Sequence, residues 1–321
     1  MVNPFDQLVG QNQAVEILTQ AIAQNRVAPA YLFSGSDGVG RSLAARCFVE
    51  QLFYSHSASK QQKVHHRLQL GNHPDLLWVE PTYLHQGQRL SAAEATAAGV
   101  KRKAPPVIRI EQIREIEQFL SRPPLEAPRA VVVVEQAETM AEAAANALLK
   151  TLEEPGQATL ILIAPATEAL LPTLVSRCQR IPFYRLDAAS MVQVLRQTGY
   201  EQILAQPSIV AIAQGSPGKA IASWQKLQDI PSGLLEKLSQ LPESRHDALE
   251  LARQIEKMDT EAQVWLVDYL QHCYWQKYLL GEIQRSPLEK LETARRHLLG
   301  YAQPRLVWEV TLLDLTPAPV S

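Results

Sequence analysis

A glycine-rich loop near the N-terminus constrains the fold of this chain more than any other feature. The apolar run Ala30–Phe33 leads into residues Gly35–Ser42, which read GSDGVGRS, and a helical pattern from Arg41 to Phe53 follows. The loop matches the phosphate-binding pattern G-x-x-x-x-G-K-[ST] at every position except the lysine. In that pattern the backbone wraps around a phosphate, and the amino end of the helix points free N–H groups at it. The sequence therefore predicts a strand, a phosphate loop and a helix in succession.

The candidate phosphate-binding residues are Gly35, Gly38, Gly40, Arg41 and Ser42. Ser42 stands where a hydroxyl would hold Mg²⁺. Arg41 replaces the compact lysine ammonium with a larger, forked guanidinium, and the two groups are not interchangeable at such a site. Two interpretations stay open. The loop binds ATP or ADP without hydrolysing it, or it is kept only as an element of the fold.

Strands and helices alternate through the first half of the chain, which favours a parallel sheet covered by helices on both faces. Between them, Ser55–Gln69 reads as a polar stretch and Gln86–Pro106 as a loose insertion. Apolar runs predict the strands Ala30–Phe33, Leu76–Val79, Ala130–Val134 and Leu160–Ile163. The expected helices are Asn12–Gln24, Arg41–Phe53, Ile110–Leu120, Ala141–Leu152 and one opened by Thr173–Cys178.

The alternation stops near Phe183, and only helical periodicity follows. A chain of 321 residues suggests two or three domains at roughly 100–150 residues each. We expect an α/β domain over residues 1–184 and helical domains over 185–228 and 229–321. The helices are expected at Ala188–Gln197, Pro207–Ala213, Gly218–Lys226, Leu234–Leu241, Arg245–Lys257, Glu261–Gly281 and Leu288–Gly300.

The end of the strand Val131–Val134 lacks the acidic pair of a working P-loop ATPase. In such an enzyme an Asp holds Mg²⁺ through the ligands of the metal, and a Glu activates the attacking water. Here the strand is followed by Glu135, whose carboxylate is one methylene too long, and by Gln136, whose amide cannot act as a general base. Taken without the phosphate loop, the same residues read as an ordinary strand end.

Four further motifs resemble those of the clamp-loader AAA+ subunits of bacterial DNA polymerase III, in the order of that family. The resemblance spans nearly the whole chain and is weakest at Ser55–Gln69 and Gln86–Pro106. It implies a P-loop AAA+ domain, a small helical lid and a helical collar that joins the subunits. The motifs are Gly71–Asp75, Asn146–Pro155, Ser176-Arg177-Cys178 and Arg305–Glu309.

Alignment on these motifs exposes two more departures from the motor subunits of the family. Their polar sensor residue after the fourth strand falls at Ala164 or Pro165, and their sensor arginine falls at Gly218. With Arg41 and the changed acidic pair, four catalytic parts are altered together, which implies lost hydrolysis. The alternatives are an active motor subunit, which would need the lysine and an Asp-Glu pair, and an unrelated adaptor on a degenerate AAA+ scaffold.

Arg177 is the catalytic residue that the resemblance retains. In the family this arginine resembles a finger that reaches across a subunit interface to a neighbour's ATP and acts in trans. Taken from the sequence alone, a solvated surface arginine or a local salt bridge is the alternative. The flanking Ser176 and Cys178 favour the finger.

No structural zinc is predicted. The family usually has a four-cysteine module before the His73-Pro74-Asp75 segment, but the cysteines here are Cys47, Cys178 and Cys273, and the nearby histidines lack ligand spacing with them. Scattered, odd-numbered cysteines fit reduced thiols in cytoplasm. No apolar run approaches a membrane span of about 18–20 residues.

The resemblance implies a stator of the clamp loader without polymerase or ATPase activity of its own. The implied partners are the motor (gamma/tau) and delta subunits, the β sliding clamp and, through the complex, primer-template DNA. A net charge of −2 gives the chain no global nucleic-acid footprint, and the short basic run Lys101–Lys103 is read as loop solvation. The expected location is the cytoplasm, at the nucleoid.

Overall fold

The structure is a computed structural model that describes residues 3–54, 61–100, 104–154, 156–283, 286–300 and 302–316. The chain divides into two compact units, with the boundary after Ser190. The first unit contains an α/β sheet and the second is helical, as the sequence predicted. The finer boundaries at residues 184 and 228 stay predictions.

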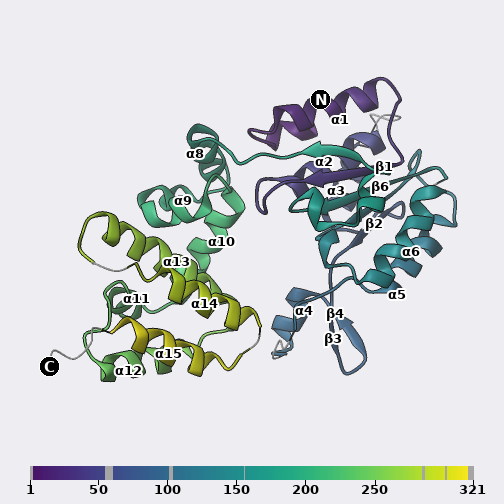
Figure 1. The fold of residues 1–321 in the computed structure, drawn as a ribbon. Coiled ribbons are helices and arrows are strands. Elements are labelled where there is room, and N and C mark those ends of the chain that lie inside the picture. The colour runs from purple at the N-terminus through teal and green to yellow at the C-terminus, as the bar shows by residue number, and fades with distance from the viewer. Residues whose placement is uncertain are drawn as a thin grey trace. The chain divides into compact units, whose positions relative to one another are not determined.

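The core of the first unit is a parallel sheet of five strands in the order β2-β5-β6-β1-β7 (Figure 1). This is the helix-covered parallel sheet that the sequence predicted. The strands are β1 (Ala30–Ser34), β2 (Leu76–Val79), β5 (Ala130–Val134), β6 (Ala158–Ala164) and β7 (Gln179–Pro182). Every residue of β5 and β6 is buried, which explains their uninterrupted apolar sequences.

Helices cover both faces of this sheet, and the alternation of side chains along β1 shows it. Leu32 belongs to a buried cluster with residues of α5, α6 and α7. Tyr31, which points to the other face, packs edge-on against Phe48 of α2. The helices of the unit are α1 (Asn12–Ala23), α2 (Arg41–Tyr54), α3 (Gln61–Gln69), α4 (Ala92–Ala97), α5 (Ile110–Leu120), α6 (Glu142–Glu153) and α7 (Pro172–Val175), with short 3₁₀ turns at Pro4–Gln7, Ala137–Thr139 and Thr167–Ala169.

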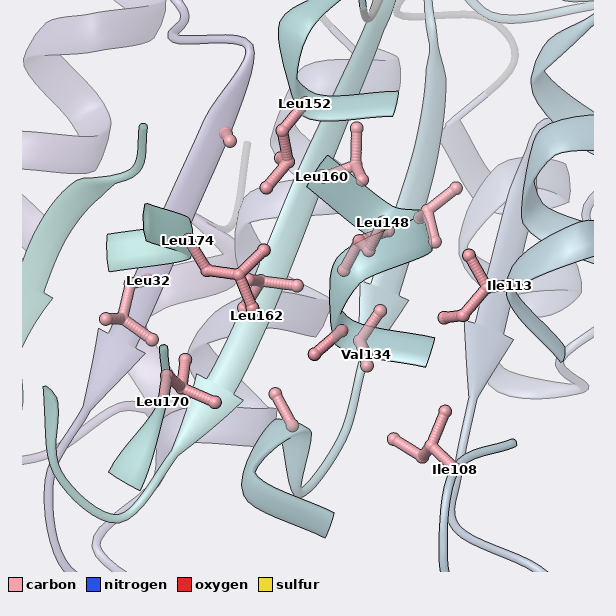
Figure 2. Close-up of a cluster of buried hydrophobic side chains, with 14 of the residues drawn as sticks. Leu32, Ile108, Ile113, Val134, Leu148, Leu152, Leu160, Leu162, Leu170 and Leu174 are labelled. Atoms are coloured by element: carbon pink, nitrogen blue, oxygen red, sulfur yellow. The ribbon is translucent and has the colours of Figure 1, made fainter. Parts of the chain in front are cut away.

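The buried cluster fixes α6 and α7 against the sheet. Figure 2 shows Leu148 and Leu152 of α6 in the same cluster as Leu160 and Leu162 of β6, and Leu174 of α7 joins them. The two helices are also in direct contact. Since well-packed cores leave little freedom, the residues that follow α6 and α7 are held in a defined relation.

The end of the first unit differs from the sequence prediction in two ways. Strand β7 was not predicted, because it is a short edge strand in which only Ile181 of the four residues is buried. The helix expected from Thr173 to Cys178 ends at Val175. Arg177 and Cys178 therefore lie in the turn between α7 and β7.

The segment Gln86–Pro106 is not a loose insertion where the structure describes it. Strands β3 (Tyr83–His85) and β4 (Gln88–Leu90) form an antiparallel hairpin, closed by Gln86 and Gly87, which both adopt positive φ. Ser91 then caps α4 in a capping box with Glu94. The basic run Lys101–Lys103 lies outside the described residues.

The polar stretch Ser55–Gln69 holds helix α3 over its second part, which the sequence reading missed because the stretch has few apolar residues. Leu68 is its buried anchor. Residues 55–60 lie outside the described part of the chain.

The second unit is a helical bundle, as predicted. Trp308 is fully buried and donates from its indole Nε1 to Gln263 Oε1 at 2.9 Å, and the Tyr274 hydroxyl donates to the Leu238 carbonyl at 2.6 Å. Among the described residues no helix is long and apolar enough to span a bilayer. The helices are α8 (Ala188–Gln197), which crosses the boundary, α9 (Pro207–Ala213), α10 (Pro217–Asp229), α11 (Ser232–Leu238), α12 (Arg245–Ile255), α13 (Thr260–Leu279), α14 (Leu288–Leu299) and α15 (Pro304–Leu315), with a 3₁₀ turn at Glu201–Ala205.

Candidate functional site

The glycine-rich loop joins the carboxyl end of β1 to α2, as predicted. Gly38 and Gly40 adopt φ of 76° and 106°, which non-glycine residues rarely reach. At Gly35 an added Cβ would lie 2.4 Å from the Phe183 carbonyl oxygen. The loop thus depends on its glycines for its shape, whether or not it holds a phosphate.

Arg41 is buried at the start of α2, and its guanidinium is paired inside the loop. Nη2 donates to Asp37 Oδ1 one helical turn earlier, and only 9% of the Arg41 side chain is exposed. Nη1 is also buried and finds no hydrogen-bond partner in the described part of the chain. The cation that replaces the usual lysine is therefore largely committed to a carboxylate of its own loop.

Two further carboxylates face the same region. Burial raises the pKa of Glu135, at the end of β5, and the nearby Glu80 adds to this, against a hydrogen bond from Ser42 and the charge of Arg41. Burial also raises the pKa of Glu138, and the charge of Asp37 adds to it. The Ser42 hydroxyl, which would hold Mg²⁺, thus faces the Glu135 carboxylate.

This arrangement does not fit a Mg²⁺-bound triphosphate. Such a group carries several negative charges, and the cation that should meet them, Arg41, is already paired with Asp37 of the loop. The unpartnered Nη1 of Arg41 still suits an anion. Gly35, Gly38, Gly40, Arg41 and Ser42 do lie together as predicted, but as a loop filled by the charges of this chain.

The other positions that depart from the motor-subunit motifs lie at the ends of strands and at the start of a helix. Ala164 is the last residue of β6 and is fully buried, and Pro165 follows it. Gln136 is exposed and starts a 3₁₀ turn at φ 47°. In the second unit Gly218 lies in the first turn of α10, which the Ser216 side chain caps by accepting from the Lys219 N–H at 3.2 Å.

Gln11 is a positioning residue of the loop that the sequence reading missed. Its side chain is only 2% exposed, and its amide donates to the carbonyls of Val39 at 3.1 Å and Tyr184 at 2.7 Å. It also accepts from the Tyr184 N–H at 3.1 Å. The available signal was a glutamine placed directly before an amphipathic helix, after the positive-φ residue Gly10.

Arg177 and the phosphate loop lie at opposite ends of two neighbouring strands. Arg177 precedes the amino end of β7, and the loop follows the carboxyl end of β1. Strand β7 begins at Gln179, which pairs with Tyr31 near the start of β1, whereas the loop follows the carboxyl end of β1. Because β1 and β7 are parallel, the start of β7 and the start of the loop are about 13 Å apart along the strand direction. Arg177 is thus placed away from the phosphate loop of its own chain.

The Arg177 guanidinium makes two contacts at that edge. Nη1 donates to the Thr173 carbonyl at 3.0 Å, and Nη2 donates to Glu153 Oε1 at 2.8 Å. The Arg177 side chain is 37% exposed and that of Glu153 is 54% exposed. The salt bridge considered in the sequence analysis is therefore present, and it leaves the arginine at the surface.

The remaining motif residues have structural partners. The buried Asp75 carboxylate accepts the backbone N–H groups of Leu125, Glu126 and Ala127 at 2.6–2.7 Å, so it orders the segment before β5. His73 stacks on Phe53 with ring centroids 4.5 Å apart, and burial lowers its pKa. This explains the Gly71–Asp75 motif as part of the fold.

No group of three His, Cys, Asp or Glu side chains that could hold a metal occurs among the described residues. Burial raises the pKa of the Cys47 thiol to about 11, and its Sγ donates to the Pro4 carbonyl at 3.1 Å. His65 Nδ1 lies 2.7 Å from Glu50 Oε1, and His56 lies outside the described residues. The absence of zinc stays a prediction.

Two DNA polymerase III subunits are similar to part of this chain. It is 30% identical over 181 residues to the DNA polymerase III subunit delta' of Bacillus subtilis, covering 55% of this chain and 48% of that protein. It is 34% identical over 197 residues to the subunit delta' of Pseudomonas aeruginosa, covering 59% and 54%. The matches therefore span about half the length of these relatives.

Among solved structures, a DNA polymerase III gamma subunit-related protein from Thermotoga maritima is similar with a TM-score of 0.49 and 18% identity, over 94% of this chain and 98% of that one. Residues 189–315 match the family model described as the C-terminal domain of cyanobacterial DNA polymerase III delta prime. Residues 10–187, more than half of the chain, match the model described as DNA polymerase III, delta subunit. The chain therefore belongs to the DNA polymerase III subunit family of that model, and its other family match and these two relatives are described as delta prime.

Proposed function

We propose that this chain is the delta-prime stator of the DNA polymerase III clamp loader and supplies Arg177 in trans to an ATP site on a neighbouring subunit. The observation that carries the proposal is the position of Arg177 at the amino end of the strands, whereas the chain's own loop lies at their carboxyl end. An arginine there cannot serve its own loop, whereas a subunit packed against that edge could bring a nucleotide to it. Its partial exposure leaves it accessible to such a partner.

The loop supports the stator half of the proposal. Arg41 is paired with Asp37, Ser42 is bonded to Glu135, and Gln136 cannot act as a base. A subunit with this loop contributes to a neighbour's hydrolysis and performs none itself. In this function the loop is kept as an element of the fold.

The helical part of the chain would act as a lid over residues 185–228 and as a collar over residues 229–321. The partners would be the motor (gamma/tau) and delta subunits, and the assembly would open the β sliding clamp and place it on primed DNA in the cytoplasm. Co-purification with the motor and delta subunits separates this function from an adaptor unrelated to replication. Binding to neither subunit would contradict it.

The finger is tested with Arg177→Ala in a loader reconstituted from purified subunits. An arginine finger is worth roughly 10³–10⁵ in rate at one site, and other sites keep their own fingers, so the rate of the whole complex falls by less. The loss should appear in kcat with KM for ATP little changed, because the charge that the finger stabilises develops in the transition state.

The control is Arg114→Ala, an exposed arginine on α5 outside the motifs. Assembly of both variants is checked by gel filtration. An unchanged rate for Arg177→Ala, or a complex that fails to form, would show that Arg177 is structural.

A further inference from the structure

The ion pair between Arg177 and Glu153 bears on how a finger at this position would work. The carboxylate that accepts from Nη2 lies 2.8 Å away, and it is supplied by the last residue of α6. A guanidinium in contact with a carboxylate forms a pair with no net charge. The attraction that the pair exerts on a distant phosphate is therefore much weaker than that of the arginine alone.

The position of Glu153 is set by the core and not by the ion pair. Leu148 and Leu152 of α6 lie in the same buried cluster as Leu174 of α7, and α6 and α7 are in contact (Figure 2). Glu153 directly follows Leu152, and Arg177 follows α7 by two residues. The two side chains thus meet because the helices beneath them are packed together.

The second contact of Arg177 also holds its guanidinium against this chain. Nη1 donates to the carbonyl of Thr173, one turn earlier in the chain, at 3.0 Å. Both terminal nitrogens are therefore engaged on this chain's own surface, where a transferring phosphate would have to compete for them. A finger that acts on a neighbour must exchange these partners for phosphate oxygens.

We infer that Glu153 is a positioning residue that holds Arg177 in a resting orientation, from which the arginine is released when it engages a neighbour's nucleotide. This inference rests on the proposed trans function of Arg177. Glu153 acts through Arg177 and touches no substrate itself. It holds the finger on this chain's own surface until the charge that develops on the transferring phosphate displaces it.

The size of the effect follows from exposure. Both partners are more than one third exposed, and exposed ion pairs contribute little. Removing the charge of Glu153 should therefore raise the turnover of the neighbour's site by about two- to fivefold. The Debye length shortens as salt rises, so this difference should shrink at high ionic strength.

The experiment measures steady-state ATPase of the reconstituted loader with wild-type chain, Glu153→Gln, Arg177→Ala and the double variant. The matched control is Glu126→Gln, because Glu126 also accepts from an exposed arginine, Arg67, at 2.6 Å in the same unit. Thermal unfolding of each purified chain checks that folding is intact. We expect Glu153→Gln to raise kcat at unchanged KM, Glu126→Gln to leave kcat unchanged, and the double variant to match Arg177→Ala.

The outcomes separate this inference from the proposed function. If Arg177→Ala leaves the loader rate unchanged, the trans function itself fails. If Arg177→Ala lowers the rate and Glu153→Gln lowers it too, Glu153 orients the finger for action, and the resting role is wrong. If Glu153→Gln has no effect, or raises the rate equally in the absence of Arg177, the inference is overturned while the trans function stands.

Discussion

Gln11 binds both backbone polar groups of Tyr184, accepting from its N–H at 3.1 Å and donating to its carbonyl at 2.7 Å. The two residues are 173 positions apart, so this one amide joins the start of the first unit to the segment after its last strand. The same amide donates to Val39 in the phosphate loop. The shape of the loop therefore depends on a side chain outside it.

Gln11→Ala should lower the free energy of unfolding by about 1–3 kcal/mol, because it leaves the buried Val39 carbonyl and the partly buried Tyr184 backbone groups without this partner. Urea unfolding measures this loss. Hydrogen exchange over residues 183–186 should also become faster, since the Tyr184 N–H loses its acceptor. The control is Gln20→Ala, whose exposed amide bonds Glu16 on its own helix. Equal unfolding midpoints for both variants would contradict the role given to Gln11.

The purified chain should show no ATP turnover above background. Arg41→Lys alone should not restore it, because Gln136 and Ala164 still lack the groups that hydrolysis needs. Release of phosphate measured at saturating ATP checks both statements, with a motor subunit as the positive control. A steady rate that disappears on Ser42→Ala would refute the prediction.

Stability should depend on pH through Glu135. Burial raises the pKa of this carboxyl in the folded chain, so the folded state keeps the proton to higher pH than the unfolded state. As pH rises from the ordinary glutamate value through the raised one, the unfolded state loses its proton first and stability falls. Glu135→Gln removes this loss.

The variant should therefore be more stable than the wild type at about pH 7 and equally stable at about pH 3, where the wild-type carboxyl is protonated in both states. Thermal unfolding at the two pH values measures the difference. Glu117→Gln, an exposed position on α5, provides the control. The same gap at both pH values would show that the carboxyl is not the cause.

Protein purified without added metal should contain well below one equivalent of zinc. Its described cysteines are engaged in packing, and His65 is paired with Glu50. Elemental analysis settles the point. Near one equivalent would identify histidines as ligands and would contradict the reading of this region.

Long-range periodicity made much of this fold predictable. Strand β5 was placed at its exact bounds because Ala130–Val134 is an unbroken apolar run between polar turns. Strand β7 was missed because an edge strand buries one face over few residues, and Gln179 and Arg180 give it a polar sequence. The hairpin β3–β4 escaped for a similar reason, since its strands have three residues each.

The site was predictable in its residues and not in its contacts. The spacing of Gly35, Gly40 and Ser42 identified the loop, because that backbone shape requires those residue types. The carboxylate that meets Arg177 lies 24 positions away, and the partners of Gln11 are 28 and 173 positions away. Such pairs are set by the packing of helices against the sheet, which local sequence does not encode.

The placement of Arg177 and the phosphate loop at opposite ends of the strands of one sheet has a consequence for assembly. Subunits that each supply an arginine at one end and accept a neighbour's arginine at the other join head to tail, and a row of them has a direction. A subunit that can supply an arginine but holds no nucleotide for a neighbour's arginine has only one possible place in such a row, at an end. Under the proposed function, the charges that fill this chain's loop would thus mark where the arc of subunits terminates and where it can open.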